Sequence, residues 1–483
     1  MTSLATRAPW RVLDGFGRAV QVASRSIKPR DLDELRAVFA RASAEGLPIT
    51  FRGAGRSYGD ASINEGGVVV DLTGLDRIDA WDPHTGIVDA QPGVTIEGLW
   101  RRILGDGWWP LVVPGTMRPT LAGCVSMNVH GKNNFRVGAF GDQLESFDLL
   151  SPDGQLRTLS RTENAELFRA AVGGLGLLGA ITRVRLRTKK VESGLMRVRE
   201  RAGRTLDEMF DLFEQYLPDA DYLVGWLDCF SSGADLGRGQ LHVAHYLHAG
   251  EDPDPARSLD VARQDLPSSM FGLPKKHLWR IMRPFLRDPF VQLVNWAKYV
   301  KARIGDDATY LQSHVAFAFL LDYVPDWRLA YGPGGFIQYQ VFVPDHGARE
   351  CLRDVLRICQ EEDFTSYLGV MKRHRADDYL LTHALDGWSL AMDFPVRDTS
   401  EMRWRARLAK VTERLSERVI AAGGRFYFAK DAVLRPLDVQ RAFGAEKLAE
   451  FAAIRRRLDP NQQLSSALAH RLLGDGNVTH HGR

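Results

Sequence analysis

Hydrophobic residues recur at helical spacing between residues 30 and 45, and the stretch ends at Gly46, so the pattern predicts a helix there. The sequence LPITFRG follows as a short apolar run that enters a glycine-rich turn, which indicates a buried strand. From Gly66 to Leu104, β-branched runs alternate with Gly and Pro turns before a helical stretch. This mixture predicts an α+β fold, because a doubly wound sheet would alternate strand and helix regularly.

The same mixture continues to about residue 190 and then changes. The sequence ESFDLLSPDGQLRTLS predicts a hairpin that turns at Asp153-Gly154. Beyond residue 195, helical runs such as LDEMFDLFEQYL and strands such as YLVGWLDCF and GGFIQYQVFVP predict a second domain to about residue 410. The last segment is expected to hold a long helix, the strand RFYFAKD and a terminal helix ending in LDPNQQLSSALAHRLL.

Composition narrows the class of protein. The 483 residues leave room for two or three domains, and a formal net charge of +3 argues against a nucleic-acid binder, which usually carries a large basic excess. None of the four cysteines belongs to a C-x-x-C pair, so we expect neither a metal site nor a redox dithiol. So few cysteines suit a reducing compartment, and no apolar run typical of a signal peptide follows the N-terminus. We therefore expect a cytoplasmic protein.

A glycine-rich turn, FRGAGRSYGD, occupies residues 51–60. Its glycines permit positive φ and close approach of the backbone to a ligand. Successive N–H groups in such a turn bind an anion, Ser57 adds a hydroxyl donor, and Arg52 and Arg56 add positive charge. The turn therefore predicts a diphosphate site, with a surface turn that needs glycine only for geometry as the alternative. The spacing does not match the G-x-G-x-x-G fingerprint of a nicotinamide-binding fold.

Two further stretches require a backbone that passes close to a ligand. Residues 113–141, VPGTMRPTLAGCVSMNVHGKNNFRVGAFG, are too rich in small and polar side chains to form a core. They suit the edge of a large planar cofactor, and a long functional loop of another kind is the alternative. Residues 173–181, GGLGLLGAI, repeat the glycine pattern.

These three segments, in this order and spacing, resemble the FAD domain of the vanillyl-alcohol-oxidase and p-cresol-methylhydroxylase (PCMH) superfamily. More closely, GAGRSYGD, VPGT, VHGKN, FGD, AYGPGGFIQYQ, GWSLAMDFP and FAKD resemble the landmarks of the decaprenylphosphoryl-β-D-ribose 2′-oxidase family, over roughly residues 25–472. The resemblance implies a two-subdomain PCMH-type FAD-binding domain in residues 1–194. It also implies a substrate (cap) domain with an antiparallel sheet in residues 195–410 and a segment, 411–483, that returns to the FAD domain.

The resemblance assigns cofactor contacts residue by residue. It places residues 53–58 on the FAD diphosphate, and other positions along the flavin, the rest of the cofactor and its adenine end. The implied FAD-binding residues are Gly53, Ala54, Gly55, Arg56, Ser57, Tyr58, Pro114, Gly115, Thr116, Thr120, Gly123, Asn128, Gly131, Lys132, Gly179, Ile181 and Tyr427. Many superfamily members attach flavin covalently through a histidine in the diphosphate loop. Arg56 stands at that place here, so we expect non-covalent FAD.

At the reacting end, the resemblance implies that Lys430 is the active-site lysine. Hydride transfer from an alcohol needs an acceptor for the hydroxyl proton, and Lys430 and His130 are the two candidates. The alternatives are a surface lysine after a strand and a buried histidine satisfied by backbone groups. The substrate-lining positions implied by the family pattern are Gln338, Gln340, Lys372 and Trp226. Ala391 stands where the family often carries a cysteine, which affects thiol-directed inhibitors but not hydride transfer.

The function that the resemblance implies is oxidation of the 2′-hydroxyl of a polyprenylphosphoryl pentose to a keto sugar, by hydride transfer to flavin N5. This would be half of an epimerisation for arabinan and cell-wall synthesis, completed by a short-chain-reductase partner. Two alternatives stay open. One is an FAD-dependent oxidase or dehydrogenase of soluble sugars, alditols or aldonolactones, and the other is a flavin-fold protein that binds without turnover.

Residues 271–304 combine basic and bulky apolar side chains with a single acid, Asp288. The basic residues are Lys275, Lys276, Arg280, Arg283, Arg287, Lys298, Lys301 and Arg303. Such a segment suits the surface of an anionic membrane, and the alternative is a solvated helical face over the core. The polyprenyl-phosphate substrate that the resemblance implies favours the membrane, so we expect the protein to bind peripherally at the inner face of the plasma membrane.

Overall fold

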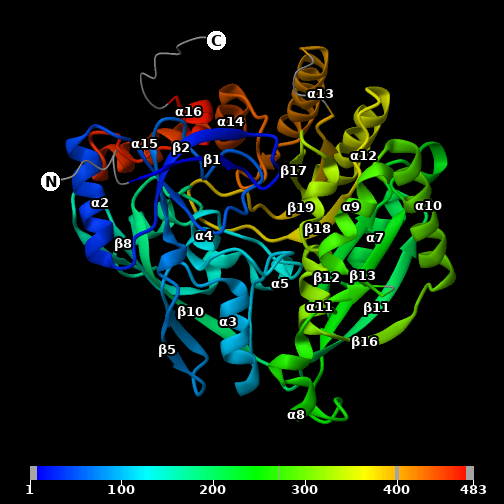
Figure 1. The fold of residues 1–483 in the computed structure, drawn as a ribbon. Helices are drawn as coiled ribbons and strands as arrows, with labels where there is room; N and C mark the ends of the chain where they lie inside the picture. The colour runs from blue at the N-terminus through cyan, green and yellow to red at the C-terminus, as the bar shows by residue number, and fades with distance from the viewer. Residues whose placement is uncertain (1–7, 271, 398–401, 475–483) are drawn as a thin grey trace.

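The computed structural model describes residues 8–270, 272–397 and 402–474, which form two halves that lie side by side (Figure 1). The first half holds two small sheets with the N-terminal strands and the last helices of the chain. The second half is built on one eight-stranded antiparallel sheet covered by helices. Helices and sheets are mixed in both halves, which confirms the predicted α+β fold class.

A four-stranded sheet in the first half positions the glycine-rich turn. Its strands, in spatial order, are β1 (Trp10–Asp14), β2 (Gln21–Ile27), β4 (Val68–Asp71) and β3 (Ile49–Arg52). Helix α2 (Leu32–Ala44) begins where the Asp31 side chain accepts the N–H of Glu34, and it packs its apolar stripe on this sheet. The predicted helix is confirmed, and β3 ends at Arg52, so the turn leaves directly from a buried strand.

The second sheet of this half carries the other glycine-rich segments. Its strands are β5 (Ile78–Asp82), β6 (Ile87–Ala90), β10 (Ala180–Lys190), β8 (Leu144–Leu150) and β9 (Leu156–Leu159), with β7 (Trp108–Pro110) paired to the end of β10. Four helices accompany it: α3 (Ile96–Ile103), α4 (Leu121–Ser126), α5 (Asn134–Val137) and α6 (Ala165–Ala171). Strands β8 and β9 form the predicted hairpin, which turns at Gly154 with a φ of +79°.

The eight-stranded sheet forms one wall of the space between the halves. Its spatial order is β16 (Thr309–Ser313), β11 (Leu195–Gly203), β13 (Gly239–Tyr246), β12 (Tyr222–Leu227), β18 (Gly369–His374), β19 (Gly387–Pro395), β17 (Phe336–Pro344) and β20 (Arg425–Phe426). Among the helices that pack on it are α7 (Leu206–Tyr216), α12 (Asp345–Glu361) and α13 (Met402–Ala421). Aromatic side chains join these layers, because Trp388 of β19 contacts Phe210 and Phe213 of α7.

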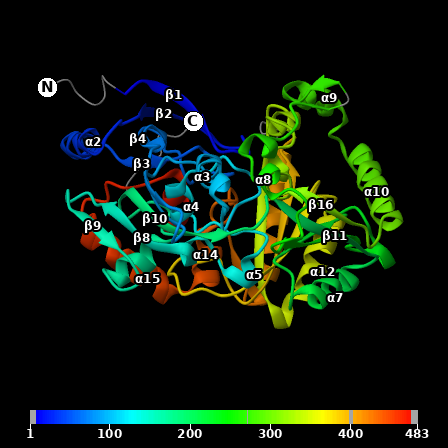
Figure 2. The ribbon, with the colours of Figure 1, turned by 90° about the horizontal axis from the view of Figure 1, so that it is seen from below.

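Further helices and strands belong to the second half. These are α8 (Pro255–Ser258), β14 (Ser269–Met270), β15 (Leu273–Pro274), α9 (Leu278–Met282), α10 (Asp288–Ile304) and α11 (His314–Ala318). Helix α10 contacts β11 and β13, and Figure 2 shows α9 and α10 at the outer edge of this half.

The C-terminal segment differs from its prediction in two places. The strand expected in RFYFAKD covers only Arg425–Phe426, because a turn follows in which the N–H of Lys430 donates to the carbonyl of Tyr427. A terminal helix ends in ALAHRLL as predicted, but it is only α16 (Ala467–Leu473). Residues 459–466 before it are not helical, and α14 (Pro436–Phe443) and α15 (Ala445–Leu458) precede them. The Asp459 carboxylate accepts the backbone N–H groups of Gln463 and Leu464 at 2.8 and 2.7 Å, which turns the chain between α15 and α16.

Candidate active site

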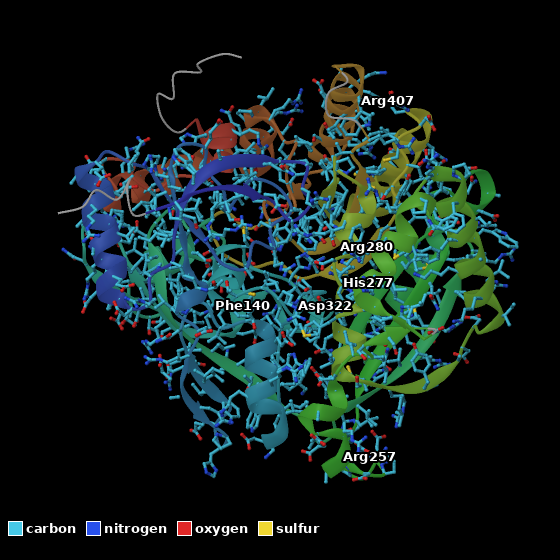
Figure 3. All side chains as sticks on the ribbon, in the orientation of Figure 1. Phe140, Arg257, His277, Arg280, Asp322 and Arg407 are labelled. Atoms are coloured by element: carbon cyan, nitrogen blue, oxygen red, sulfur yellow. The ribbon has the colours of Figure 1, made fainter. Side chains whose placement is uncertain are left out.

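A cavity of about 530 Å³ lies between the two halves. Its first-half wall consists of the glycine-rich turn, residues 114–132 and residues 175–181. Strands β12, β17 and β18 and the turn at residues 427–430 form the opposite wall. The halves are joined beside it by Asp322, which accepts hydrogen bonds from Thr116 Oγ1 at 2.8 Å and the Met117 N–H at 2.7 Å (Figure 3).

The glycine-rich turn presents its backbone and Arg56 to this cavity. Gly55 has a φ of +62°, and a Cβ on Gly53 would lie 2.1 Å from Thr120 Oγ1, so neither position accepts a larger residue without rearrangement. Arg56 Nε is buried and has no hydrogen-bond partner within the described residues. Arg52 differs from expectation, since it lies beneath the turn and donates to the Asp14 carbonyl at 3.0 Å and to Ser62. Arg52 therefore holds the turn in shape, and Arg56 is available to an anion.

The cavity brings together most residues that the sequence assigned to cofactor, substrate or catalysis. Those that line it are Gly53, Ala54, Gly55, Arg56, Ser57, Tyr58, Pro114, Gly115, Thr116, Thr120, Gly123, His130, Lys132, Gly179, Ile181, Trp226, Gln338, Gln340, Lys372, Tyr427 and Lys430. Ala391 also lines it, so the cavity wall carries a methyl group at the position where the family often has a thiol.

Asn128 and Gly131, both within the described residues, do not line the cavity. Asn128 Oδ1 accepts the N–H of Gly141 at 3.0 Å, and its Nδ2 donates to Asp377 at 2.8 Å. A Cβ on Gly131 would lie 2.5 Å from the Asn133 side-chain oxygen. These two residues shape the loop that carries His130 and Lys132 to the cavity and do not themselves face it.

Lys430 closes the end of the cavity next to Tyr58, with its Nζ 3.5 Å from the centre of the Tyr58 ring. The nearby carboxylate of Asp393, on β19, is 1% exposed and accepts a hydrogen bond from Gln338. Burial lowers the pKa of Lys430 and raises the pKa of Asp393, while their opposite charges counteract both shifts. A lysine with a lowered pKa holds part of its population as a neutral amine near neutral pH, so Lys430 is able to accept a proton.

His130 lies on the first-half wall, and its Nε2 is 3.1 Å from the side-chain nitrogen of Gln340 on the opposite wall. Its ring packs against the rings of His374, His383 and Tyr427 at centre distances of 4.9, 5.4 and 5.2 Å. Burial holds the pKa of His130 well below its usual value, so the imidazole is neutral and only weakly basic. Of the two candidates, the geometry and charge therefore favour Lys430 as the proton acceptor.

Gln338 and Gln340 alternate along β17 and face the cavity together, as a strand period of two requires. Lys372 reaches the cavity from β18, and burial lowers the pKa of Lys372 to about 8. Trp226 contributes from β12, and its side chain is buried. The residues expected to line the substrate thus belong to strands of one sheet that faces the glycine-rich turn.

Two residues at this site were not found from the sequence. Asp393 could have been suspected, because an acid within the apolar strand GWSLAMDFP must find a partner when it is buried. Lys298 was grouped with the membrane-facing bases, yet it lines the cavity, with its Nζ 3.9 Å from the centre of the Trp226 ring. No periodicity in the sequence of α10 would have revealed that direction.

The shape of the cavity and the glycine-rich turn fit a dinucleotide cofactor whose diphosphate lies against that turn. Gly53 and Gly55 leave the backbone of the turn open to a ligand, and the buried Arg56 Nε still needs a partner. A model of the FAD binding domain matches residues 23–160, which include this turn. The fold and site therefore define an FAD-dependent oxidoreductase that acts on CH–OH groups.

Curated relatives narrow this class. Decaprenylphosphoryl-beta-D-ribose oxidase of Mycolicibacterium smegmatis is 30% identical over 465 residues, which cover 95% of this chain and 97% of that protein. An uncharacterized protein of Streptomyces coelicolor is 30% identical over 78% of this chain and all of its own length. D-arabinono-1,4-lactone oxidase of Yarrowia lipolytica is also 30% identical, over 33% of this chain and 31% of its own. The chain belongs to the decaprenylphosphoryl-β-D-ribose oxidase family within the vanillyl-alcohol-oxidase and PCMH superfamily.

We expect the FAD to be bound without a covalent link, because Arg56 occupies the place of the flavin-linking histidine and a guanidinium does not form that bond. Acid precipitation of the purified protein should release the yellow colour into the supernatant, where absorption spectra would quantify it. Colour that stays with the pellet after washing would contradict this expectation.

Proposed function

We propose that this enzyme oxidises the 2′-hydroxyl of a polyprenylphosphoryl pentose to the keto sugar. The observation that carries the proposal is helix α10, which adds the cation of Lys298 to the cavity and exposes Leu293, Val294 and Trp296 on the outside. This arrangement suits a substrate with a reacting sugar, an anionic phosphate and a long apolar chain. The substrate named for the M. smegmatis relative, matched over nearly the full chain, supports the same class.

In this proposal the chain's own residues bind the sugar and handle one proton. Gln338 and Gln340 hydrogen-bond sugar hydroxyls, and the neutral amine of Lys430 accepts the proton of the reacting hydroxyl. Asp393 then stabilises the ammonium that forms on Lys430, because the two groups interact in a buried site. FAD, when bound, supplies the acceptor for the hydride.

The keto sugar needs a second enzyme to become an epimer of the substrate. A ketone at this position is reduced to the inverted alcohol by hydride from a nicotinamide, which is the chemistry of a short-chain reductase. We therefore propose such a reductase as the partner, and we place the pair in arabinan and cell-wall synthesis. This enzyme would act in the cytoplasm at the inner face of the plasma membrane.

Anaerobic bleaching of the flavin tests the substrate class. Polyprenylphosphoryl ribose should reduce the flavin rapidly, whereas free ribose, an alditol and an aldonolactone should do so slowly. Faster bleaching by a soluble sugar, alditol or lactone would replace the proposal with that substrate class. Binding of the lipid-linked sugar without any bleaching would refute it in favour of a binding protein.

The surface for the membrane proposal comprises Lys276 just before α9, α9 itself, the turn after it and the start of α10, and we name it the α9–α10 surface. It exposes four basic residues, Lys276, Arg280, Arg283 and Arg287, and apolar side chains that include Ile281, Met282, Phe285 and Phe290. Four bases that the sequence placed here lie elsewhere: Lys275 is buried, the ammonium of Lys298 lines the cavity, and Lys301 and Arg303 are exposed at the end of α10. The expected docking segment began at Phe271, which lies outside the described residues. Within the described residues, no helix is long and apolar enough to cross a bilayer.

Liposome co-sedimentation should show stronger binding to anionic than to neutral vesicles, and this binding should weaken with salt as the Debye length shrinks. Each basic residue at an anionic surface contributes about 1 kcal/mol, so Lys276, Arg280, Arg283 and Arg287 changed together to Gln should abolish most of the binding. A matched control changes four exposed bases of the first half to Gln, namely Lys28, Arg36, Arg441 and Arg456. Equal sedimentation of the two variants would mean that the α9–α10 surface is only a solvated face.

A further inference from the structure

The charged side chains that line the cavity are all cationic. They are Arg56, Lys132, Lys298, Lys372 and Lys430, and no Asp or Glu of the described residues lines it. Arg56 lies at the glycine-rich turn and serves the cofactor end. Lys132 donates to the carbonyl of Phe317, and Lys430 is balanced by Asp393. Lys298 and Lys372 are therefore the two cations that remain to bind an anionic group of a ligand at the end of the cavity away from the glycine-rich turn.

Lys298 is held in place by an aromatic contact. Its Nζ lies 3.9 Å from the centre of the buried Trp226 ring, a favourable cation–π arrangement. The side chain is exposed along its length, but its ammonium end turns inward, and loss of water there lowers the pKa of Lys298 to about 8. Within the described chain, Lys298 has no hydrogen bond or ion pair. The carboxylate of Glu200 acts on the charge of Lys298, but it accepts hydrogen bonds from Tyr310 and Gln240 at 2.7 and 2.8 Å.

An apolar stripe on α10 leads away from this ammonium. Phe290, Val294 and Lys298 follow one another at a spacing of four residues, so they lie on one side of the helix. Phe290 and Val294 are 41% and 46% exposed, which is high for side chains of this kind. A cation at the cavity and apolar side chains leading outward match the head and tail of a prenyl phosphate.

We propose that Lys298 binds the phosphate of a prenyl-phosphate ligand, with Trp226 holding the ammonium in position and the chain running along the stripe of Phe290 and Val294. This proposal rests on the proposed function and names the subsite that would separate a lipid-linked sugar from a free one. The ammonium donates hydrogen bonds to the phosphate oxygens at the low-dielectric end of the cavity, where such bonds are strong.

Farnesyl phosphate is a suitable probe, because it carries the head and tail but no sugar. Titration into the FAD-loaded enzyme, without vesicles, is followed by calorimetry and by the flavin absorption spectrum. Wild type should bind farnesyl phosphate more tightly than farnesol or inorganic phosphate. Lys298→Met should weaken this binding by about tenfold to 100-fold, the effect of one charge-assisted hydrogen bond. Val294→Asn should reduce the advantage of farnesyl over geranyl phosphate.

Lys301→Met is the matched control, since Lys301 lies on the same helix, is exposed and does not line the cavity. It should bind farnesyl phosphate like wild type. Absence of binding in wild type, unchanged binding in Lys298→Met, or equal losses in both variants would overturn the subsite, provided that FAD content is unchanged. The test requires no turnover. An enzyme that binds farnesyl phosphate through Lys298 but does not oxidise a polyprenylphosphoryl pentose would therefore refute the proposed function and retain the subsite.

Discussion

Replacing Lys430 with alanine should leave FAD bound and slow flavin reduction by about 10²–10⁴-fold, the usual effect of losing one positioned proton-handling group. The reason is its position, because its Nζ lies over Tyr58 at the end of the cavity and burial lowers the pKa of Lys430. Stopped-flow bleaching of the flavin by the substrate proposed above measures the rate directly. The visible spectrum of the variant reports whether the cofactor is retained.

Lys447→Ala serves as its control. Lys447 belongs to the same C-terminal segment, on α15, and does not line the cavity. It should reduce its flavin at the wild-type rate. A Lys430→Ala variant that keeps FAD and bleaches at a near-normal rate would reject a role for Lys430 in proton transfer. His130 would then be the remaining candidate for the proton acceptor.

Replacing Arg471 with methionine should lower the free energy of unfolding by about 3–5 kcal/mol and weaken FAD binding. Arg471, on α16, donates to Asp60 at the end of the glycine-rich turn and to Asp431 beside Lys430, in each case at 2.8 Å. The side chains of Asp60 and Asp431 are only 6% and 3% exposed, so the variant leaves two buried carboxylates without their cation. Because the Arg471 side chain is 26% exposed, water weakens the interaction, and we expect a loss of unfolding free energy near the lower end of that range.

The companion variant is Arg457→Met. Arg457 of α15 pairs with Glu166 at 2.7 Å, but both side chains are 55% exposed, so this loss should cost less than about 1 kcal/mol. Denaturant unfolding of both proteins, followed by flavin fluorescence and circular dichroism, gives the comparison. Equal stabilities of the two variants would show that the Arg471 bridge contributes no more than a surface ion pair.

The sequence by itself determined the elements whose causes are local. The spacing of apolar residues in 30–45 predicted α2, and the Asp153-Gly154 pair predicted the hairpin of β8 and β9, because each pattern is read within a few residues. The glycines of residues 53–59 likewise indicated a backbone open to an anion, since only glycine fits such a turn. The motifs shared with the decaprenylphosphoryl-β-D-ribose oxidase family then identified the family and FAD as the cofactor.

The tertiary structure decided what depends on residues far apart in the chain. The charge of Asp393 counteracts the lowered pKa of Lys430 because strand pairing brings the two residues together. Strand β17 pairs on one side with β19, which carries Asp393, and on the other with β20, which precedes the turn of Lys430. Neighbours that a sheet brings together across the chain leave no mark in either local sequence. The bases of residues 271–304 show the same limit, since composition counted eight equivalent charges. Packing buries Lys275, turns the ammonium of Lys298 to Trp226 and leaves others on the surface, because the direction of a long side chain is set by what it packs against.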